Sequence, residues 1–486
     1  QAKSYRWPTG LAFPLYTLTI VVAYLSELLM TTKRKINPER VYYNYDGRIP
    51  PVRLEAKPAA LPNGRVDGLP KLITDTTLRD GAQDSRLALF PNEARLRYVD
   101  LLHDLDNGTG VIYSIETFIY QERDLWVLDK LLEREYDYPK ITTWIRANPK
   151  DVRRLSEVSQ GRVKETGMLA SSSDHHIFDK LGFRSKEEAI DKYLRPILTA
   201  CEYGITPRVH LEDCTRADID GWVLPFMQTV LEATEGLARF RVCDTIGWGS
   251  PDPYVALPQG VPRLIATLFA ETGAELEFHG HNDFGLATAN SLAAWRYGCR
   301  KVNVTFGSLG ERTGNSSLEQ VLAGYVRLYG DPGFGQPVLA EMKRMVEEYL
   351  VPLAATAPII GDVFTTQAGI HQAGVARQDD APGGLIYLAY DPAVVGSEGA
   401  ERSVVGALSG SEGIVSILNR EAEVRGLEVR FSGTNRVVKE IYDRIQAIYD
   451  GEYDESADAW VNYRTTFFQP DEIWRMAVEL GAADGG

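Results

Sequence analysis

The sequence predicts an α/β protein built on a (β/α)8 barrel, followed by a C-terminal domain of mainly helical and mixed structure. Eight short runs rich in β-branched residues recur between Leu72 and Gly307, each followed by a longer amphipathic stretch. They occupy about 240 residues, which is the size of one closed barrel. Polar residues stand at the end of most runs, and barrels of this kind carry their chemistry at that face.

Length and composition limit the class of protein. A chain of 486 residues is too long for one typical domain, so we assign 71–330 to a catalytic barrel and 331–486 to a C-terminal lid and dimerisation domain. Its 44% hydrophobic and 24% charged residues are typical of globular proteins. A net charge of -15 argues against a nucleic-acid partner. Four cysteines without a CxxC pair indicate neither a disulfide framework nor a zinc knuckle, and favour a reducing, cytoplasmic setting.

The N-terminal segment 1–36 contains a predicted hydrophobic helix, Leu11 to Met30. Its twenty residues carry one charge, Glu27, and are long enough to cross a bilayer. The basic run that follows, with Lys33 and Arg34, would place the enzyme body on the cytoplasmic face of that membrane. The alternative is an apolar helix packed on protein or in an oligomer interface, because Pro14 and Glu27 weaken the case for a membrane span. Both interpretations stay open.

The remaining elements follow in order along the chain. The leader 37–70, rich in Pro, Gly, Asn and Arg, is predicted to wrap the barrel without regular structure. The eight predicted strands are LITDT near Ile73 and the runs that end at Phe118, Ala147, Ser172, Asp213, Gly247, Asn282 and Gly307. The helices predicted between them include Asn92 to Leu105, Lys186 to Tyr203 and Ala287 to Tyr297.

The pair His279 and His281 predicts a metal site. Residues two apart on a strand point to the same side, so two imidazoles can meet one cation, with Gly280 leaving room between them. The alternative is a pair of hydrogen-bonded core histidines. Asp80 follows the first strand and Asn315 the eighth, and both strands neighbour the seventh in a closed barrel. These four residues are therefore the predicted ligands of Mn2+, Mg2+ or Zn2+.

Other polar residues at strand ends are catalytic or substrate-binding candidates. Arg79 cannot lose its proton at working pH, so it would stabilise a developing negative charge, unless it serves only as a structural ion pair with Glu116 or Glu212. Glu212 could move a proton if the pocket raises its pKa, and is otherwise a hydrogen-bond anchor. His371 follows a Gly-containing turn, where a lone histidine is commonly a surface or capping residue. The substrate-binding candidates are Arg79, Glu116, Arg146, Thr245 and His176.

Four ordered motifs resemble one enzyme family. They are DTTLRDGAQ (Asp75 to Gln83), HGHNDFGLA (His279 to Ala287), GERTGN (Gly310 to Asn315) and TTQAGIHQAG (Thr365 to Gly374). They are similar to the family that condenses acetyl-CoA with 2-oxo acids, which includes isopropylmalate, homocitrate and citramalate synthases and is related to hydroxymethylglutaryl-CoA lyase. The likeness runs from about Asn37 to about Asn419, and stretches such as TTWIRANPKD and HLEDCTRAD look most like the Re-face-specific citrate-forming branch.

The resemblance implies a function for the predicted site. It implies that the four ligand residues hold the metal, that Arg79 stabilises the enolate or keto oxygen, and that Thr245 binds the acid's carboxylate. Glu212 and His371 match the proton-transfer positions, with the histidine delivered by the partner subunit of a homodimer that exchanges C-terminal domains. The implied reaction is a Claisen condensation of acetyl-CoA with a 2-oxo acid, oxaloacetate giving citrate as first choice, followed by thioester hydrolysis. Such an enzyme is an acyltransferase of the EC 2.3.3 type.

Departures from the family pattern leave alternatives. The segment after Asp391 lacks the Tyr of isopropylmalate synthases, and the catalytic Cys loop of the lyases is missing from Gly307 to Asn315. His175 stands where the citrate-forming branch is expected to have Tyr. Homocitrate or isopropylmalate synthesis is the alternative activity. The alternative of another class is a membrane-anchored structural subunit that keeps a barrel for assembly.

Overall fold

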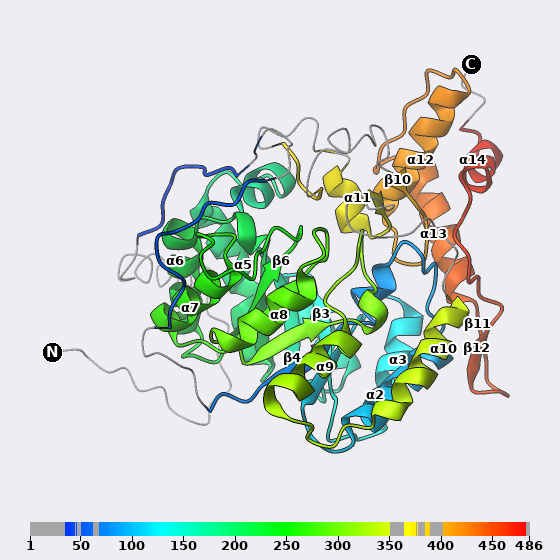
Figure 1. The fold of residues 1–486 in the computed structure, drawn as a ribbon. Coiled ribbons are helices and arrows are strands. Elements are labelled where there is room, and N and C mark those ends of the chain that lie inside the picture. Colours follow the sequence, from blue (N-terminus) through cyan, green and yellow to red (C-terminus); the bar gives the residue numbers. More distant parts are fainter. Residues whose placement is uncertain are drawn as a thin grey trace.

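The predicted barrel is confirmed by the computed structural model, which describes residues 35–43, 45, 50–61, 68–349, 364–375, 377, 384–388 and 402–482. Eight parallel strands close in sequence order, with β1 paired to both β2 and β8 (Figure 1). The strands are β1 (Leu72–Asp75), β2 (Ile112–Thr117), β3 (Lys140–Ile145), β4 (Glu165–Ser171), β5 (Thr206–Glu212), β6 (Arg239–Asp244), β7 (Leu276–Gly280) and β8 (Lys301–Val304).

Several strands end earlier than the sequence predicts, and this places polar residues on the loops at the barrel mouth. The sixth predicted run extends to Gly247, but β6 ends at Asp244. There the Asp244 carboxylate accepts a hydrogen bond from the backbone N–H of Gly249 at 2.9 Å, which turns the chain. The eighth run likewise ends at Val304 instead of Gly307. Thr245 and the loop to Asn315 therefore lie just beyond the strands.

Helices surround the barrel, and an apolar core fills the space between the two layers. Asn148 accepts a hydrogen bond from the N–H of Asp151 at 2.9 Å and so begins α4, and Ser185 begins α5 in the same way. The three helices predicted by name correspond to α2, α5 and α8. The bounds are α2 (Asn92–Asp106), α3 (Glu122–Leu132), α4 (Pro149–Val158), α5 (Lys186–Glu202), α6 (Leu224–Ala233), α7 (Val261–Thr272), α8 (Ala287–Arg296) and α9 (Leu318–Tyr329).

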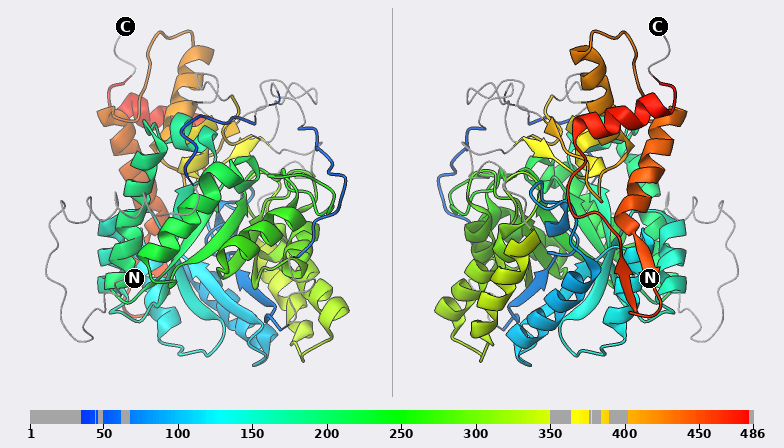
Figure 2. Two further views of the ribbon diagram at one scale, coloured as in Figure 1. Left: turned by 90° about the vertical axis from the view of Figure 1, so that its left-hand side faces the viewer. Right: turned by 90° about the vertical axis from the view of Figure 1, so that its right-hand side faces the viewer.

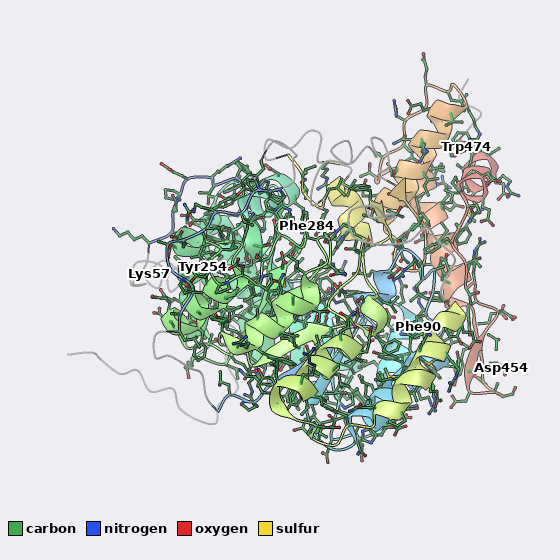
Figure 3. All side chains as sticks on the ribbon, viewed as in Figure 1. Lys57, Phe90, Tyr254, Phe284, Asp454 and Trp474 are labelled. Atoms are coloured by element: carbon green, nitrogen blue, oxygen red, sulfur yellow. The ribbon has the colours of Figure 1, made fainter. Side chains whose placement is uncertain are left out.

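The C-terminal part lies beside the barrel and has its own apolar core (Figures 1 and 2). Ile417, Ile441 and Trp474 belong to this core, and Trp474 is labelled in Figure 3. Leu89, which comes from the barrel side, joins the same cluster, so the two parts are packed together. α10 (Leu339–Tyr349) packs on the barrel core through Met342 and Val346. The elements that follow it are β9 (Thr365–Thr366), α11 (Gly369–Val375), β10 (Arg402–Ser403), α12 (Ser411–Val424), α13 (Arg436–Asp450), β11 (Glu452–Asp454), β12 (Ala459–Val461) and α14 (Pro470–Glu479).

The described parts of the leader run along the outside of the barrel. The N–H of Asn37 donates to the carbonyl of Gly221 at 2.7 Å, and Leu54 forms an isolated bridge with Val255. The predicted apolar helix from Leu11 to Met30 lies outside the described residues. Within the described part of the chain, no helix combines the length and apolar character that a membrane crossing needs.

Candidate active site

A cavity of about 490 Å³ opens at the carboxyl ends of the strands. Its walls come from both parts of the chain, because barrel residues face Gly369, Ser409 and Gly410 across it. A volume of this size suits a small-molecule site. The sequence-predicted residues that line it are Arg79, Asp80, Arg146, Glu212, Thr245, His279, His281 and His371.

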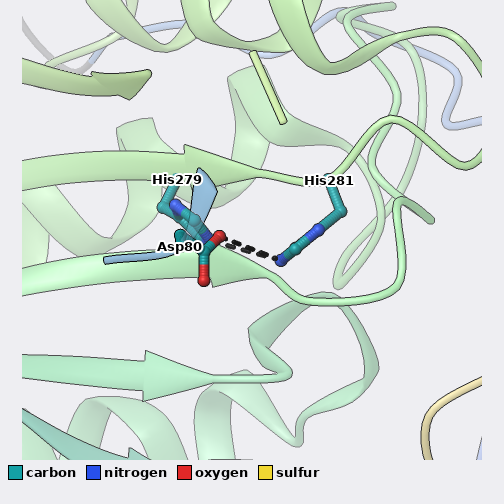
Figure 4. A group of neighbouring side chains, drawn as sticks. All are labelled: Asp80, His279 and His281. Carbon is teal, nitrogen blue, oxygen red and sulfur yellow. Dashed lines mark hydrogen bonds and ion pairs between the residues drawn. The ribbon is translucent and has the colours of Figure 1, made fainter. Parts of the chain in front are cut away.

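Asp80, His279 and His281 converge at the barrel mouth (Figure 4). The Nε2 atoms of His279 and His281 lie 3.6 Å and 3.7 Å from Oδ2 of Asp80, and 3.4 Å from each other. One ligand atom from each of the three residues falls within 4.8 Å of the others. All three side chains are buried. This is the arrangement expected of residues that share one cation.

Asn315 stands behind this group and completes the donor set. Its Nδ2 donates to Oδ2 of Asp80 at 2.8 Å, while its buried Oδ1 has no hydrogen-bond partner among the described residues. A buried amide oxygen without a partner is costly, and a cation would satisfy it. His281 and Asn315 also form a backbone bridge, which fixes the loop after β8 against the end of β7. The donor set of one carboxylate, two imidazoles and one amide oxygen therefore fits a divalent metal.

The protonation states favour the same conclusion. Burial raises the pKa of Asp80, but the charge of Arg79, helped by the hydrogen bond from Asn315, opposes burial and holds that pKa below its ordinary value. Burial is the main cause that lowers the pKa of His279 and of His281. Nδ1 of His279 lies 2.8 Å from Oδ1 of Asn303, so Nδ1 carries the proton of the neutral ring and donates it to that amide oxygen. The lone pair of Nε2 is then available to bind a metal. Asp80 is thus ionised and both imidazoles are neutral, as metal binding requires.

Arg79 is held by an acidic group inside the barrel. Its Nε donates to Oε2 of Glu116 at 2.8 Å, and its NH1 donates to Asp80. Glu116 is 1% exposed and also contacts Arg208 and Arg241, so the charges of these arginines, against the effect of burial, lower its pKa well below the ordinary value. The sequence named Glu116 as substrate-binding. The structure instead places it beneath the cavity, where three guanidinium groups occupy its oxygens.

Glu212 lines the cavity within a cluster of donors. Lys180 Nζ donates to its Oε2 at 2.5 Å, Tyr387 Oη donates to its Oε1 at 2.6 Å, and Nδ1 of His176 lies 3.0 Å from Oε2. Burial raises its pKa, but Lys180 and His176 outweigh burial and hold the pKa well below its ordinary value. The direction of this shift is opposite to the raised pKa under which the sequence assigned proton transfer to Glu212. Glu212 anchors Lys180, Tyr387 and His176.

His371 reaches the same cavity from α11 of the same chain. Its ring stacks on Tyr387 with the centroids 4.2 Å apart, and its Nδ1 lies 3.5 Å from NH1 of Arg312. The centroid of the His281 ring is 6.5 Å away. Burial, followed by the charge of Arg312, lowers the pKa of His371 to about 3, so the imidazole is neutral at pH 7. His371 thus lies over the barrel of its own chain, and its delivery by a partner subunit stays a prediction from the resemblance.

Three further predicted residues occupy different places. The Thr245 hydroxyl lines the cavity and accepts a hydrogen bond from the N–H of Asp213 at 2.8 Å, which leaves its own proton for another acceptor. Arg146 stands at the rim, where its Nε donates to Asp151 at 2.9 Å and its guanidinium covers the ring of Tyr120. His176 is fully buried behind Glu212 and does not line the cavity.

The sequence missed residues that support His371 and Glu212. Lys180, Tyr387 and Arg312 belong to no helical or strand periodicity in the sequence. Arg312 is held by a bidentate contact with Asp283, with distances of 2.7 Å and 3.0 Å. Only the positions of Arg312 and Asp283 in the sequence indicate a place near the site. Arg312 lies inside GERTGN, and Asp283 comes two residues after His281.

Comparisons with known proteins identify the family of the chain. The profile of the HMGL-like family matches residues 71–346. The citrate (Re)-synthase of Clostridium kluyveri is 38% identical over 319 residues, which are 63% of this chain and 69% of that protein. The citrate (Re)-synthase of Syntrophus aciditrophicus is 34% identical over 394 residues, 77% of this chain and 60% of that protein.

A third relative has a different name. The 2-phosphinomethylmalate synthase of Streptomyces hygroscopicus is 37% identical over 317 residues, 63% of this chain and 71% of that protein. The chain therefore spans between 60% and 71% of the length of these three relatives. Since the family profile covers more than half of the chain and falls on the strands that carry the metal-site residues, the chain belongs to the HMGL-like family.

Proposed function

We propose that the protein condenses acetyl-CoA with a 2-oxo acid in a metal-dependent Claisen reaction and then hydrolyses the thioester, with oxaloacetate giving citrate as first choice. The observation that carries the proposal is the convergence of Asp80, His279, His281 and Asn315 beside Arg79 in a cavity that also contains His371. The names of two relatives, both citrate (Re)-synthases, support the choice of acid.

Each residue has a task that its surroundings allow. A divalent cation held by the four ligand residues would polarise the ketone of the 2-oxo acid as a Lewis acid. The Arg79 guanidinium, fixed by Glu116 and directed toward Asp80, offsets the negative charge that develops on the ketone oxygen. The Thr245 hydroxyl faces the cavity with a free proton and can donate it to the acid's carboxylate.

His371 is the base that the geometry favours. It stands at the cavity wall as a neutral imidazole, but burial and Arg312, whose NH1 lies 3.5 Å from Nδ1, lower its pKa to about 3. To accept a proton from the methyl group of acetyl-CoA, the ring must therefore be released from Arg312 when the substrates bind. The carbon that loses this proton forms a bond with the keto carbon, and the ketone oxygen takes up a proton. Water then cleaves the C–S bond of the thioester and releases coenzyme A with a free thiol. Glu212 acts through Tyr387, whose ring stacks on His371 while its hydroxyl donates to that carboxylate.

The choice of metal follows from the ligand atoms, and the oligomeric state and the alternative acids follow from the resemblance. Mn2+ or Mg2+ suits a site with two oxygen ligands, and Zn2+ suits the two imidazoles. A homodimer with exchanged C-terminal domains and a membrane tether through Leu11 to Met30 stay predictions from the sequence. Homocitrate or isopropylmalate synthesis would use the same ligand set with another acid.

A panel of 2-oxo acids tests the proposed reaction. The protein is incubated with acetyl-CoA, Mn2+ and, separately, oxaloacetate, 2-oxoglutarate, 2-oxoisovalerate or pyruvate, and free thiol is followed by its reaction with a disulfide dye. We expect thiol release with oxaloacetate to exceed that with each other acid by at least about tenfold, which corresponds to about 1.4 kcal/mol of discrimination. Turnover with another acid alone would move the assignment to a sister activity. No release with any acid would contradict the proposal.

A further inference from the structure

Glu311, in the loop after β8, binds the backbone of the C-terminal part. The side chain is 0% exposed, and its Oε1 accepts a hydrogen bond from the N–H of Ala368 at 2.6 Å. The N–H of Gln367 lies 3.2 Å and 3.3 Å from the two carboxylate oxygens. The barrel thus holds these two residues through one buried carboxyl group.

The two residues that Glu311 holds lead directly into the helix that carries His371. The N–H groups belong to Gln367 and Ala368, and α11 begins at Gly369. The N–H of Gln372 donates to the carbonyl of Ala368 at 2.9 Å, so the first turn is continuous with the residue that Glu311 binds. The place of His371 over the cavity therefore depends on where this segment is fixed.

The same segment is tied on its other side to the C-terminal part. Ser409 Oγ donates to the carbonyl of Gln367 at 2.9 Å, and Gln372 Nε2 donates to the carbonyl of Val404 at 3.0 Å. An apolar cluster adds Phe364 and Leu388, against which Phe284 from the loop after β7 packs. Contacts to Ser409 and Val404 hold α11 to the C-terminal part, whereas Phe284 and Glu311 hold the segment before α11 to the barrel loops.

Burial opposes the ionisation of the Glu311 carboxyl group. Burial raises the pKa of Glu311 to about 8, and only the two N–H groups and the charge of Arg312 oppose that effect. Nearby Glu319 also accepts a backbone hydrogen bond, from Gly307 at 3.0 Å, but on the exposed side of the loop and away from α11. Glu311 and Glu319 therefore form a matched pair for comparison.

We infer that Glu311 is a positioning residue, which fixes α11 on the barrel so that His371 faces the metal-site residues. This inference rests on the proposed function for its effect on rate. Glu311 does not line the cavity, so its loss should reduce the rate without weakening the binding of the 2-oxo acid.

Rates of four variants test the inference. We expect Glu311→Ala to lower kcat about 100-fold with the KM for the 2-oxo acid changed less than about threefold, while Glu311→Gln, which keeps one acceptor oxygen, loses less than about tenfold. The double variant of Glu311→Ala with His371→Ala should be no slower than His371→Ala alone, because the two residues act as one unit. Multiplicative losses in the double variant, or a kcat of Glu311→Ala within threefold of the parent, would overturn the inference.

Amide hydrogen exchange gives a readout that does not depend on activity. In Glu311→Ala, the peptide containing Gln367 and Ala368 should exchange at least about tenfold faster, with the β-strands unchanged. In Glu319→Ala that peptide should exchange as in the parent. If this peptide exchanges at the parent rate in Glu311→Ala, or if exchange becomes faster throughout the barrel, the inference is wrong. If the proposed function itself fails, the parent releases no thiol, and the exchange result still decides whether Glu311 holds the segment.

Discussion

Replacement of His281 by alanine is expected to abolish condensation and to weaken divalent-metal binding by at least about 100-fold. The Nε2 of His281 faces Asp80 and His279, and within the part of the chain that the structure describes its Nδ1 has no hydrogen-bond partner. Loss of a residue that only supports a metal ligand costs about 10- to 100-fold in affinity, and a ligand itself should cost more. Calorimetric titration of the variant with Mn2+ measures the change.

A second histidine provides the control for this substitution. His103 stacks on Tyr136 on the outside of the barrel, and its Nδ1 lies 2.6 Å from the carbonyl oxygen of Tyr138. The His103→Ala variant should bind Mn2+ as the parent does. If His281→Ala binds Mn2+ within threefold of the parent affinity, the residue is no metal ligand and the predicted site is wrong.

The Arg79→Lys variant is expected to lose catalytic rate while it keeps its affinity for the metal. Nε of Arg79 donates to Glu116 while NH1 donates to Asp80, and a lysine ammonium cannot occupy both positions. Removal of one preorganised donor from a developing oxyanion typically costs 100- to 1000-fold, or about 3–4 kcal/mol, so kcat should fall by about that factor. The affinity for Mn2+ should not weaken, because Asp80, His279 and His281 all stay. Steady-state rates measure the expected fall in kcat, and a titration of the same preparation with Mn2+ measures the metal affinity.

Arg134→Lys is the matched control. Arg134 also bridges two oxygens, those of Asp100, but at the barrel exterior. This variant should keep the parent rate. If Arg79→Lys loses Mn2+ binding together with activity, Arg79 serves to hold Asp80 and not to offset charge in the reaction.

The barrel could be predicted because its signal is local. Each strand is a short apolar run with a polar residue after it, and each helix has its own periodicity, so the order of elements is present in the sequence. The interior of the barrel could not be predicted so well. Arg208 and Arg241 point inward from β5 and β6 into a layer where branched apolar residues are usual, and the runs gave no indication of it. Glu116 was therefore assigned to substrate instead of to these arginines.

The site was predictable where spacing carries the geometry. His279 and His281 lie two apart on one strand, and Asp80 and Asn315 follow the strands that close the barrel beside it, so their convergence follows from topology. Tyr387 and Lys180 come from irregular or short elements whose positions depend on tertiary packing. The environment of Glu212 depends on both, and for this reason the direction of its pKa shift could not be read from sequence.

The most direct test of the account is the metal dependence of thiol release by the full chain. The protein is stripped with a chelator, dialysed, and supplied with acetyl-CoA and oxaloacetate, and Mn2+ is then added in steps. We expect no thiol release above background before Mn2+ is added. Added Mn2+ should restore thiol release, which saturates at one Mn2+ per Asp80–His279–His281 site, and one citrate should form for each thiol released. Release at the parent rate by the stripped protein in excess chelator would contradict it.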